Sequence, residues 1–332
     1  MNKLLLATLL TGISFCATAQ TNVRFSHEWR FEGHVAPFLV PLDKGYYKAE
    51  GLNVTVDPGT GSPDVIIRVA TRAYDMGLAD INSLVRYRDN PANAQLKAVM
   101  IVYDAAPFSL LTLKKNNIKK PKDLEGRTLG APAGDATWTN FPILAKLNNI
   151  DTGKIRVENV GFPIREPMLA QGKVDAVTAF VSNASGLVAQ GVPESEVEVI
   201  MYSAFGVDLY GSAVIVNPEF LKSQPQAVAA FVRALIKGFQ DSVRDPEDAI
   251  ESVTKRNPLV KRDLEVYRLK RVNELVYVTD NVKKNGFGAV DMKRLERAID
   301  QLGIAFSYTN KPMAADIFTS EFLPPREQRL PK

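Results

Sequence analysis

Short apolar runs alternate with longer amphipathic runs along the chain from residue 21 onward. The apolar runs have the length of buried strands, and the runs between them have apolar positions at helical spacing. The predicted strands are 23–26, 52–56, 75–79, 96–103, 108–113, 128–131, 155–159, 176–180, 197–202 and 212–216. The predicted helices between them include 35–50, 62–72, 81–88, 137–148 and 164–171. This alternation predicts an α/β fold with mainly parallel sheets flanked by helices.

The order of strand, glycine loop, helix and strand occurs twice along the chain. Gly61-Ser62-Pro63 and Gly161-Phe162-Pro163 lie 100 residues apart, and each precedes a predicted helix and then a predicted strand. The offset indicates one supersecondary unit used in both halves of the chain. We therefore expect two lobes, each with its own sheet.

Beyond residue 216 the pattern predicts helices alone. A long helix begins at Pro225, and its apolar positions form one stripe that faces a core. The last clear helix covers 292–302, with Gly303 as its C-cap. Because these helices have no sheet of their own, we expect them to pack on the first lobe.

The first nineteen residues have the features of a secretory signal peptide. Lys3 precedes an apolar stretch over 4–15, and Ala17-Thr18-Ala19 matches a cleavage site. The alternative is a buried N-terminal helix. The chain's single cysteine, Cys16, lies in this segment and follows Phe15, whereas a lipid-attached cysteine needs a small residue before it. We therefore expect an exported, unlipidated periplasmic protein with no disulfide in its mature form.

Composition narrows the functional classes. A chain of 332 residues exceeds what one core usually covers, and 45% hydrophobic with 23% charged residues is ordinary for a globular protein. These values exclude disordered, collagen-like and polytopic membrane classes. The net charge of +4 is too small to indicate nucleic-acid binding.

Catalytic and metal-binding signatures are missing from the sequence. It contains no G-x-S-x-G, P-loop or G-x-G-x-x-G motif. The only histidines are His27 and His34, so we expect neither a metal site nor a cofactor. A Ser-His-acid triad that uses His34 stays open as an alternative, although no serine lies in a nucleophile-type turn.

Candidate ligand-binding residues lie in the loops that follow predicted strands, because ligands of open α/β sheets bind at the carboxyl ends of the strands. The candidates are Trp29, Phe31, Glu32, His34, Gly61, Ser62, Asp80, Asn82, Gly134, Asp135, Thr137, Trp138, Arg165, Glu166, Ser182 and Tyr210. The rings can stack on a planar group, and the glycine loops can present backbone N–H groups at a helix start. The alternatives are that the rings belong to the core, that the glycine loops are plain turns, that Asp80 or Asn82 caps the helix that follows, and that Arg165 pairs with Glu166.

Four segments carry a resemblance to a known family. They are Pro41-Leu42-Asp43-Lys44-Gly45-Tyr46-Tyr47-Lys48-Ala49-Glu50-Gly51-Leu52-Asn53-Val54, Tyr74-Asp75-Met76-Gly77, Pro121-Lys122-Asp123-Leu124-Glu125-Gly126-Arg127-Thr128-Leu129-Gly130 and Gly172-Lys173-Val174-Asp175-Ala176. In this order they resemble bacterial periplasmic solute-binding proteins of ABC importers. The most similar group binds taurine, alkanesulfonates and nitrate, or pyrimidine precursors of thiamine. The resemblance covers residues 24 to 220.

The resemblance implies a two-lobed periplasmic binding protein of type II. Its second lobe, 105–206, would be inserted into a first lobe made of 20–104 and 207–332. Two crossover strands would join the lobes near 102–106 and 204–208. The implied partners are a small-molecule ligand and the permease and ATPase of an ABC importer. The resemblance further implies a monomer that is not an enzyme.

Two departures from the family pattern change which class of ligand we expect. Glu32-Gly33-His34 stands where pyrimidine binders carry an Asn-His pair, and Asp135 stands in the loop where sulfonate binders place an anion cradle. Three acids, Asp80, Glu32 and Asp135, face one arginine and one histidine among the candidates. This balance favours a planar nitrogen compound with amino donors, such as a pyrimidine. The alternatives are a sulfonate, taurine or nitrate anion, an exported enzyme on the same fold, and a solute receptor for a sensor.

Overall fold

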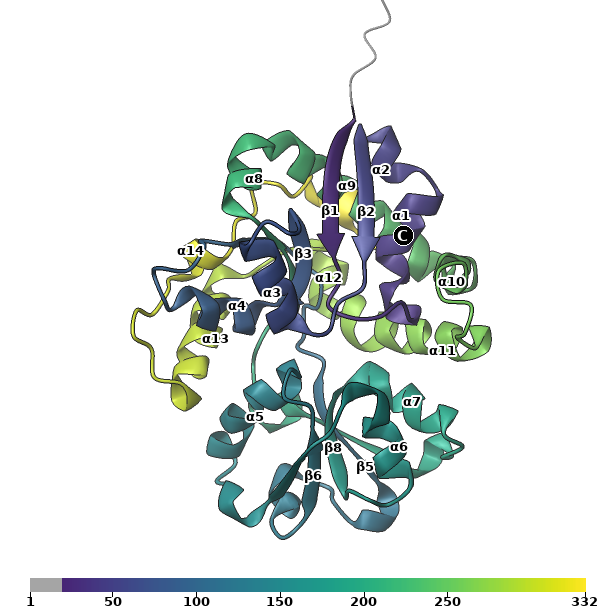
Figure 1. Cartoon of the computed structure of the whole chain (residues 1–332), viewed down its shortest axis with the longest axis vertical. Helices are drawn as coiled ribbons and strands as arrows, with labels where there is room; N and C mark the ends of the chain where they lie inside the picture. The colour runs from purple at the N-terminus through teal and green to yellow at the C-terminus, as the bar shows by residue number, and fades with distance from the viewer. Residues whose placement is uncertain (1–19) are drawn as a thin grey trace, which may run out of the picture.

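The computed structural model describes residues 20–332, and Figure 1 shows them as two lobes, one above the other. The predicted signal peptide, residues 1–19, and Cys16 within it lie outside the described residues. Each lobe contains one five-stranded sheet. The α/β class, the two sheets and their flanking helices confirm the predicted architecture.

The first sheet belongs to the upper lobe of Figure 1. Its strand order is β2-β1-β3-β10-β4. The strands are β1 (Thr21–Ser26), β2 (Leu52–Asp57), β3 (Met76–Asp80), β4 (Lys97–Ile101) and β10 (Ser212–Val216). β1 pairs in parallel with β2 and β3, whereas β10 is antiparallel to both of its neighbours. The sheet is therefore mixed, with one reversed strand.

The second sheet repeats this plan in the lower lobe. Its order is β7-β6-β8-β5-β9, and β5 is the reversed strand. The strands are β5 (Phe108–Leu113), β6 (Thr128–Ala131), β7 (Arg156–Asn159), β8 (Ala176–Phe180) and β9 (Val197–Met201). In both sheets the reversed strand is the first one that the chain forms after it crosses between the lobes.

Two crossing segments, 102–107 and 206–211, connect the sheets side by side. The Gly211 N–H donates to the Tyr103 carbonyl at 2.9 Å, and the Ala106 N–H donates to the Leu209 carbonyl at 3.2 Å. The second crossing lies slightly later than the predicted 204–208, because residues Tyr202–Phe205 form a 3-10 turn at the end of β9. The exact lobe boundaries stay a prediction.

Of the helices predicted before β10, 81–88 has the predicted bounds, 137–148 is displaced by one residue, and the others are shorter than predicted. The helices observed there are α1 (Ala36–Asp43), α2 (Tyr46–Ala49), α3 (Ser62–Ala70), α4 (Ile81–Arg88), α5 (Ala136–Leu147), α6 (Arg165–Ala170) and α7 (Ala184–Ala189). The single helix predicted over 35–50 is wrong. Gly45 has φ of 72°, a left-handed conformation that ends α1 and starts α2.

The helices after β10 lie around the first sheet (Figure 1). They are α8 (Pro218–Ser223), α9 (Pro225–Arg244), α10 (Pro246–Thr254), α11 (Arg262–Val272), α12 (Asp280–Asn285), α13 (Met292–Ala305), α14 (Ala314–Ile317) and α15 (Arg326–Arg329). The apolar stripe of α9 is buried, and Phe231 stacks between Phe25 and Tyr47. Gly303 lies inside α13, so its predicted role as a C-cap is wrong.

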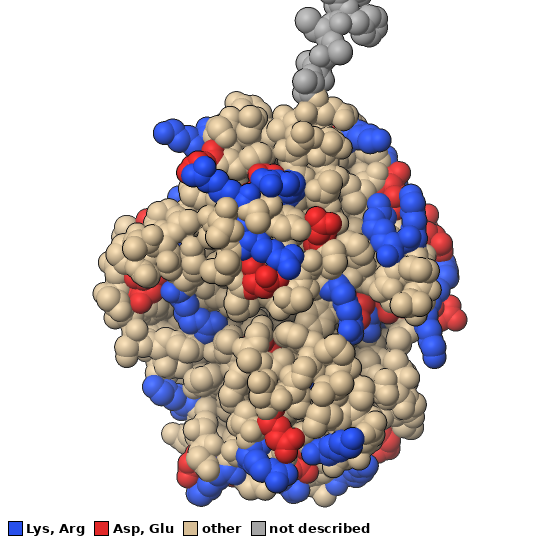
Figure 2. All heavy atoms as spheres, in the orientation of Figure 1, with Lys and Arg blue, Asp and Glu red and all other residues tan. Residues whose placement is uncertain are grey.

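Charged side chains are spread over the face drawn in Figure 2, where Lys and Arg alternate with Asp and Glu on both lobes. Such interspersed charge fits the small net charge of the sequence. Within residues 20–332, none of the helices is long and apolar enough to cross a lipid bilayer.

Candidate functional site

A small cavity of about 30 Å³ lies between the two lobes. Its walls come from both of them. The first lobe contributes Glu28, Trp29, His34, Gly61 and Ser62, and the second contributes Gly134, Asp135, Ala136, Phe162, Arg165, Phe180, Ser182 and Asn183. Most of these residues follow the carboxyl end of a strand or begin a helix, which is where an open α/β sheet binds its ligands.

Glu28 is a buried carboxyl group at the first-lobe wall. The hydroxyls of Ser62 and Ser212 donate to its two oxygens at 2.5 and 2.6 Å, and only 3% of the residue is exposed. Burial raises the pKa of Glu28 to about 7, and the nearby Asp80 carboxylate acts in the same direction. Near neutral pH the group is therefore divided between its ionised and neutral forms.

The pKa of Glu28 makes a testable contribution to stability. A carboxyl whose pKa is raised in the folded protein destabilises the fold progressively as pH rises from its ordinary value of 4.5 to about 7. Glu28→Gln stays neutral at every pH. We therefore expect its melting temperature to exceed that of the wild type by a margin that grows as pH rises across that interval. Calorimetric melting of both ligand-free proteins measures the difference.

Comparing the two proteins at each pH cancels the opposite effect of the buried histidines. Burial lowers the pKa of His27 and His34, and this favours folding as pH rises. A melting difference between Glu28→Gln and the wild type that stays constant over the interval would show that Glu28 does not titrate there.

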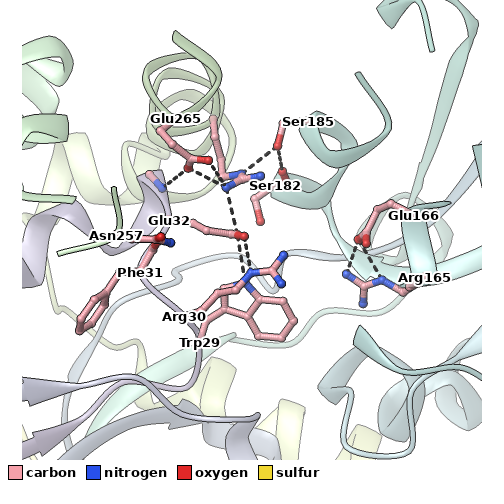
Figure 3. A network of polar contacts seen from close by, with 12 residues as sticks. Trp29, Arg30, Phe31, Glu32, Arg165, Glu166, Ser182, Ser185, Asn257 and Glu265 are labelled. Atoms are coloured by element: carbon pink, nitrogen blue, oxygen red, sulfur yellow. Dashed lines mark hydrogen bonds and ion pairs between the residues drawn. The ribbon is translucent and has the colours of Figure 1, made fainter. Parts of the chain in front are cut away.

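Trp29 and Phe162 face each other across the cavity from opposite lobes. Their rings are edge to face, with centroids 4.7 Å apart. The indole Nε1–H of Trp29 donates to Glu32 at 3.1 Å, as Figure 3 shows, and the Arg30 guanidinium lies 5.6 Å from the centroid of the ring. Because the Trp29 and Phe162 rings already touch, a planar group has to part them before it can stack on either one.

His34 lines the cavity with a neutral imidazole. Burial, together with the guanidinium groups of Arg268 and Arg30, lowers the pKa of His34 to about 3. Within the described residues its Nδ1 atom has no hydrogen-bond partner although it is buried. The Nδ1 atom of the neighbouring His27 accepts the backbone N–H of Trp29 at 3.0 Å. His34 therefore keeps one buried polar atom without a partner in the described part of the chain.

The second-lobe wall holds a buried cation between two acids. Arg165 is 1% exposed and donates to Glu166 at 3.0 and 2.6 Å, and its Nη1 lies 3.7 Å from Asp135. Asp135 accepts from the Thr178 hydroxyl at 2.7 Å, and burial raises the pKa of Asp135. Of the two alternatives for Arg165, a pair with Glu166 or an anion site, the structure shows the pair with Glu166. Since two carboxylates already neutralise this cation, an incoming anion gains little from it.

The structure brings half of the predicted site residues to the cavity. These are Trp29, His34, Gly61, Ser62, Gly134, Asp135, Arg165 and Ser182. Glu32 and Glu166 lie one layer behind, where they hold Trp29 and Arg165. Whether any of these residues contacts a ligand stays a prediction.

The other six predicted residues lie away from the cavity wall. Phe31 packs against the core, Asp80 accepts from the Ser83 N–H as the N-cap of α4, and Asn82 donates to Asp80 and to the carbonyl of Tyr210. Thr137 is fully buried. The Tyr210 ring packs under the guanidinium of Arg294, 4.1 Å away. Trp138 faces a separate apolar groove and stacks on Phe141.

Five lining residues were not predicted: Glu28, Ala136, Phe162, Phe180 and Asn183. Phe162 and Asn183 lie in loops that the strand-end rule had already selected, so the rule itself could have found them. Glu28 follows β1 by two residues, and only its contacts with Ser62 and Ser212 mark it as a cavity residue.

A family model described as "NMT1/THI5 like" matches residues 32–249. The chain is 25% identical to riboflavin-binding protein RibY of Chloroflexus aurantiacus over 87% of this chain and 82% of that protein. It is 25% identical to the formylaminopyrimidine-binding protein of Halalkalibacterium halodurans over 96% and 99%. A further relative, from Schizosaccharomyces pombe, is named 4-amino-5-hydroxymethyl-2-methylpyrimidine phosphate synthase, with 25% identity over 68% and 66%.

Solved structures show the same fold. The aliphatic sulphonate-binding protein SsuA of Escherichia coli superimposes with a TM-score of 0.69 over 94% of this chain and 97% of that chain, at 14% identity. The nitrate-binding protein NrtA of Synechocystis gives a TM-score of 0.69 over 93% and 91%, at 12% identity. The fold is thus the periplasmic-binding-protein fold of ABC importers.

Proposed function

The chain belongs to the NMT1/THI5-like family, and from this premise we propose that it captures a small planar nitrogen compound between its lobes and delivers it to an ABC permease. The observation that carries the proposal is a cavity closed from both lobes, with rings and buried acids in its walls. A ligand that touches both lobes favours the closed form, and the closed form can then be recognised at the membrane.

The charges in the wall support a ligand that donates hydrogen bonds. Glu28 and Asp135 line the cavity, and Glu166 lies behind it, against the single guanidinium of Arg165. Ring N–H and amino groups match these acceptors, whereas a sulfonate or nitrate would meet them with like charge. Two relatives are named for binding a formylaminopyrimidine and riboflavin, both of which are nitrogen heterocycles.

The proposal includes the cellular setting. Residues 1–19 act as a signal peptide, and the mature protein works as a periplasmic monomer with a permease and an ATPase. Its lobes are 20–104 with 207–332, and 105–206. We propose that it binds its ligand without converting it, although some relatives are named synthases.

A binding panel tests the proposal. Calorimetry and thermal shift would compare 4-amino-5-hydroxymethyl-2-methylpyrimidine, riboflavin, taurine and nitrate. Saturation at 100 times Kd adds about 2.7 kcal/mol to stability, so a true ligand raises the melting temperature measurably. We expect Trp29→Ala to weaken binding of the heterocycle by about tenfold through lost stacking.

The second tryptophan is a matched control. Trp138 has the same side chain but faces the separate groove, so Trp138→Ala should lower affinity much less than Trp29→Ala. Tight binding of taurine or nitrate without binding of either heterocycle would overturn the ligand class. Recovery of a chemically altered ligand after incubation would instead indicate an enzyme.

A further inference from the structure

A chain of polar contacts runs from the second lobe to the indole of Trp29, and Arg268 is its central residue. Arg268 lies on α11 of the first lobe and is 5% exposed. Its Nε–H donates to the Ser185 hydroxyl on α7 of the second lobe at 2.8 Å. Its Nη1 donates to Glu265 at 2.8 and 2.6 Å and lies 3.0 Å from Glu32. One guanidinium therefore contacts both lobes.

Glu32 links Arg268 to the indole of Trp29 at the cavity, as the dashed lines in Figure 3 show. One of its oxygens accepts the Trp29 indole N–H at 3.1 Å and also faces Arg268, and the other accepts the Arg30 Nε–H at 2.5 Å. The residue is only 5% exposed, so its carboxylate needs these partners. The position of the Trp29 ring thus depends on where Arg268 holds Glu32.

The helix that carries Arg268 also contacts the backbone of the loop that contains Glu32. Glu265 accepts the Gly33 N–H at 2.5 Å, and a Cβ atom at Gly33 would lie 2.3 Å from the Glu265 carbonyl oxygen. The Tyr277 hydroxyl, on the π-helical turn Asn273–Tyr277 that follows α11, donates to the His34 carbonyl at 2.7 Å. The loop and α11 therefore move together.

We propose that Arg268 is a positioning residue that couples closure of the lobes to the placement of the Trp29 ring. The proposal rests on the proposed function in that Trp29 faces the ligand. When the lobes part, Arg268 loses Ser185, and its guanidinium is free to turn between Glu265 and Glu32. When they close, Ser185 fixes the guanidinium, and Glu32 then holds the indole at the cavity. Ser185 itself donates to the carbonyl of Ser182, which lines the cavity.

The coupling is reciprocal. A contact that stabilises the closed form of the lobes is itself stabilised when the lobes close. Losing one charge-assisted hydrogen bond lowers the closed-to-open ratio by about tenfold. Ser185→Ala removes the contact of Arg268 with the second lobe and the hydrogen bond from Ser185 to Ser182, and it leaves the contacts of Arg268 with Glu32 and Glu265 intact. A role for Arg268 in stability alone would therefore leave Trp29 unaffected by this substitution.

The test uses ligand-free protein and the fluorescence of Trp29. The chain has two tryptophans, so Trp138→Phe leaves Trp29 as the only one. In this background we expect Ser185→Ala to increase acrylamide quenching of Trp29 and to shift its emission to longer wavelength. Arg268→Lys, which cannot reach all three partners, should give at least as large a change.

Tyr267→Phe is the matched control. Tyr267 lies beside Arg268 on α11 and donates to Glu194 of the second lobe, so its loss also removes one contact between the lobes. Its partner has no link to Glu32, so we expect only the smaller change in Trp29 that a weaker closure produces by itself. Equal changes in Ser185→Ala and Tyr267→Phe, a change in Arg268→Lys alone, or no change in any variant would each overturn the proposal. Because no ligand is used, the result is independent of the binding panel.

Discussion

Replacing Gly61 with alanine should weaken ligand binding by about tenfold or more, because the new methyl group would block closure of the lobes. Gly61 has φ of 110°, and a Cβ atom there would lie 2.8 Å from the carbonyl oxygen of Gly134 in the other lobe. Alanine would therefore be strained within its own loop and would push the second lobe away. Calorimetry gives the affinity for the heterocycle that the panel identifies, and small-angle scattering gives the radius of gyration with and without it.

Gly134 supplies the control for this experiment. It lies on the opposite side of the same contact, but the nearest atoms to an added Cβ are 3.8 and 3.9 Å away. We expect Gly134→Ala to bind and to close like the wild type. If Gly61→Ala reached the radius of gyration of the wild type at saturation, the proposed steric block to closure at this contact would be disproved.

Replacing Arg165 with methionine should have the largest effect on stability. It leaves the carboxylates of Asp135 and Glu166 buried without their cation, which costs about 3–5 kcal/mol. The loss should shrink as pH falls, because protonation removes the uncompensated charge. Urea unfolding at neutral and acidic pH measures both effects.

An exposed ion pair provides the comparison. Arg271 pairs with Glu274 at 3.0 Å, with both side chains close to half exposed or more, so Arg271→Met should cost less than about 1 kcal/mol. A loss for Arg165→Met no larger than that for Arg271→Met would mean that the buried carboxylates find other partners or are already neutral.

The sequence pattern predicted the architecture because strand length and apolar spacing record burial directly. Phe231 shows this, since its place in the stripe of α9 corresponds to its stack between Phe25 and Tyr47. The pattern could not predict that Gly45 would divide one helix into two. A glycine within a helical run is compatible with either outcome, and the left-handed φ appears only in three dimensions.

The candidate site was only half predictable for a similar reason. Trp29 and Trp138 both follow strand ends, yet only the first reaches the cavity. Trp138 is already inside α5, where it stacks on Phe141 three residues later, and the direction of a helical side chain decides its neighbours. For Asp80 and Asn82 the sequence allows either a ligand contact or a helix cap, and the structure shows Asp80 as the cap of α4.

The strand order of the first sheet also governs the sequence of events during synthesis. β10 lies between β3 and β4, yet residues 212–216 leave the ribosome only after all five strands of the second sheet. The nascent first lobe therefore has a gap next to its last strand, with the edges of β3 and β4 unpaired. A single late strand both fills this gap and draws the two crossings together, so a chain that stops before residue 212 has every strand of the second sheet but lacks the strand that joins β3 to β4.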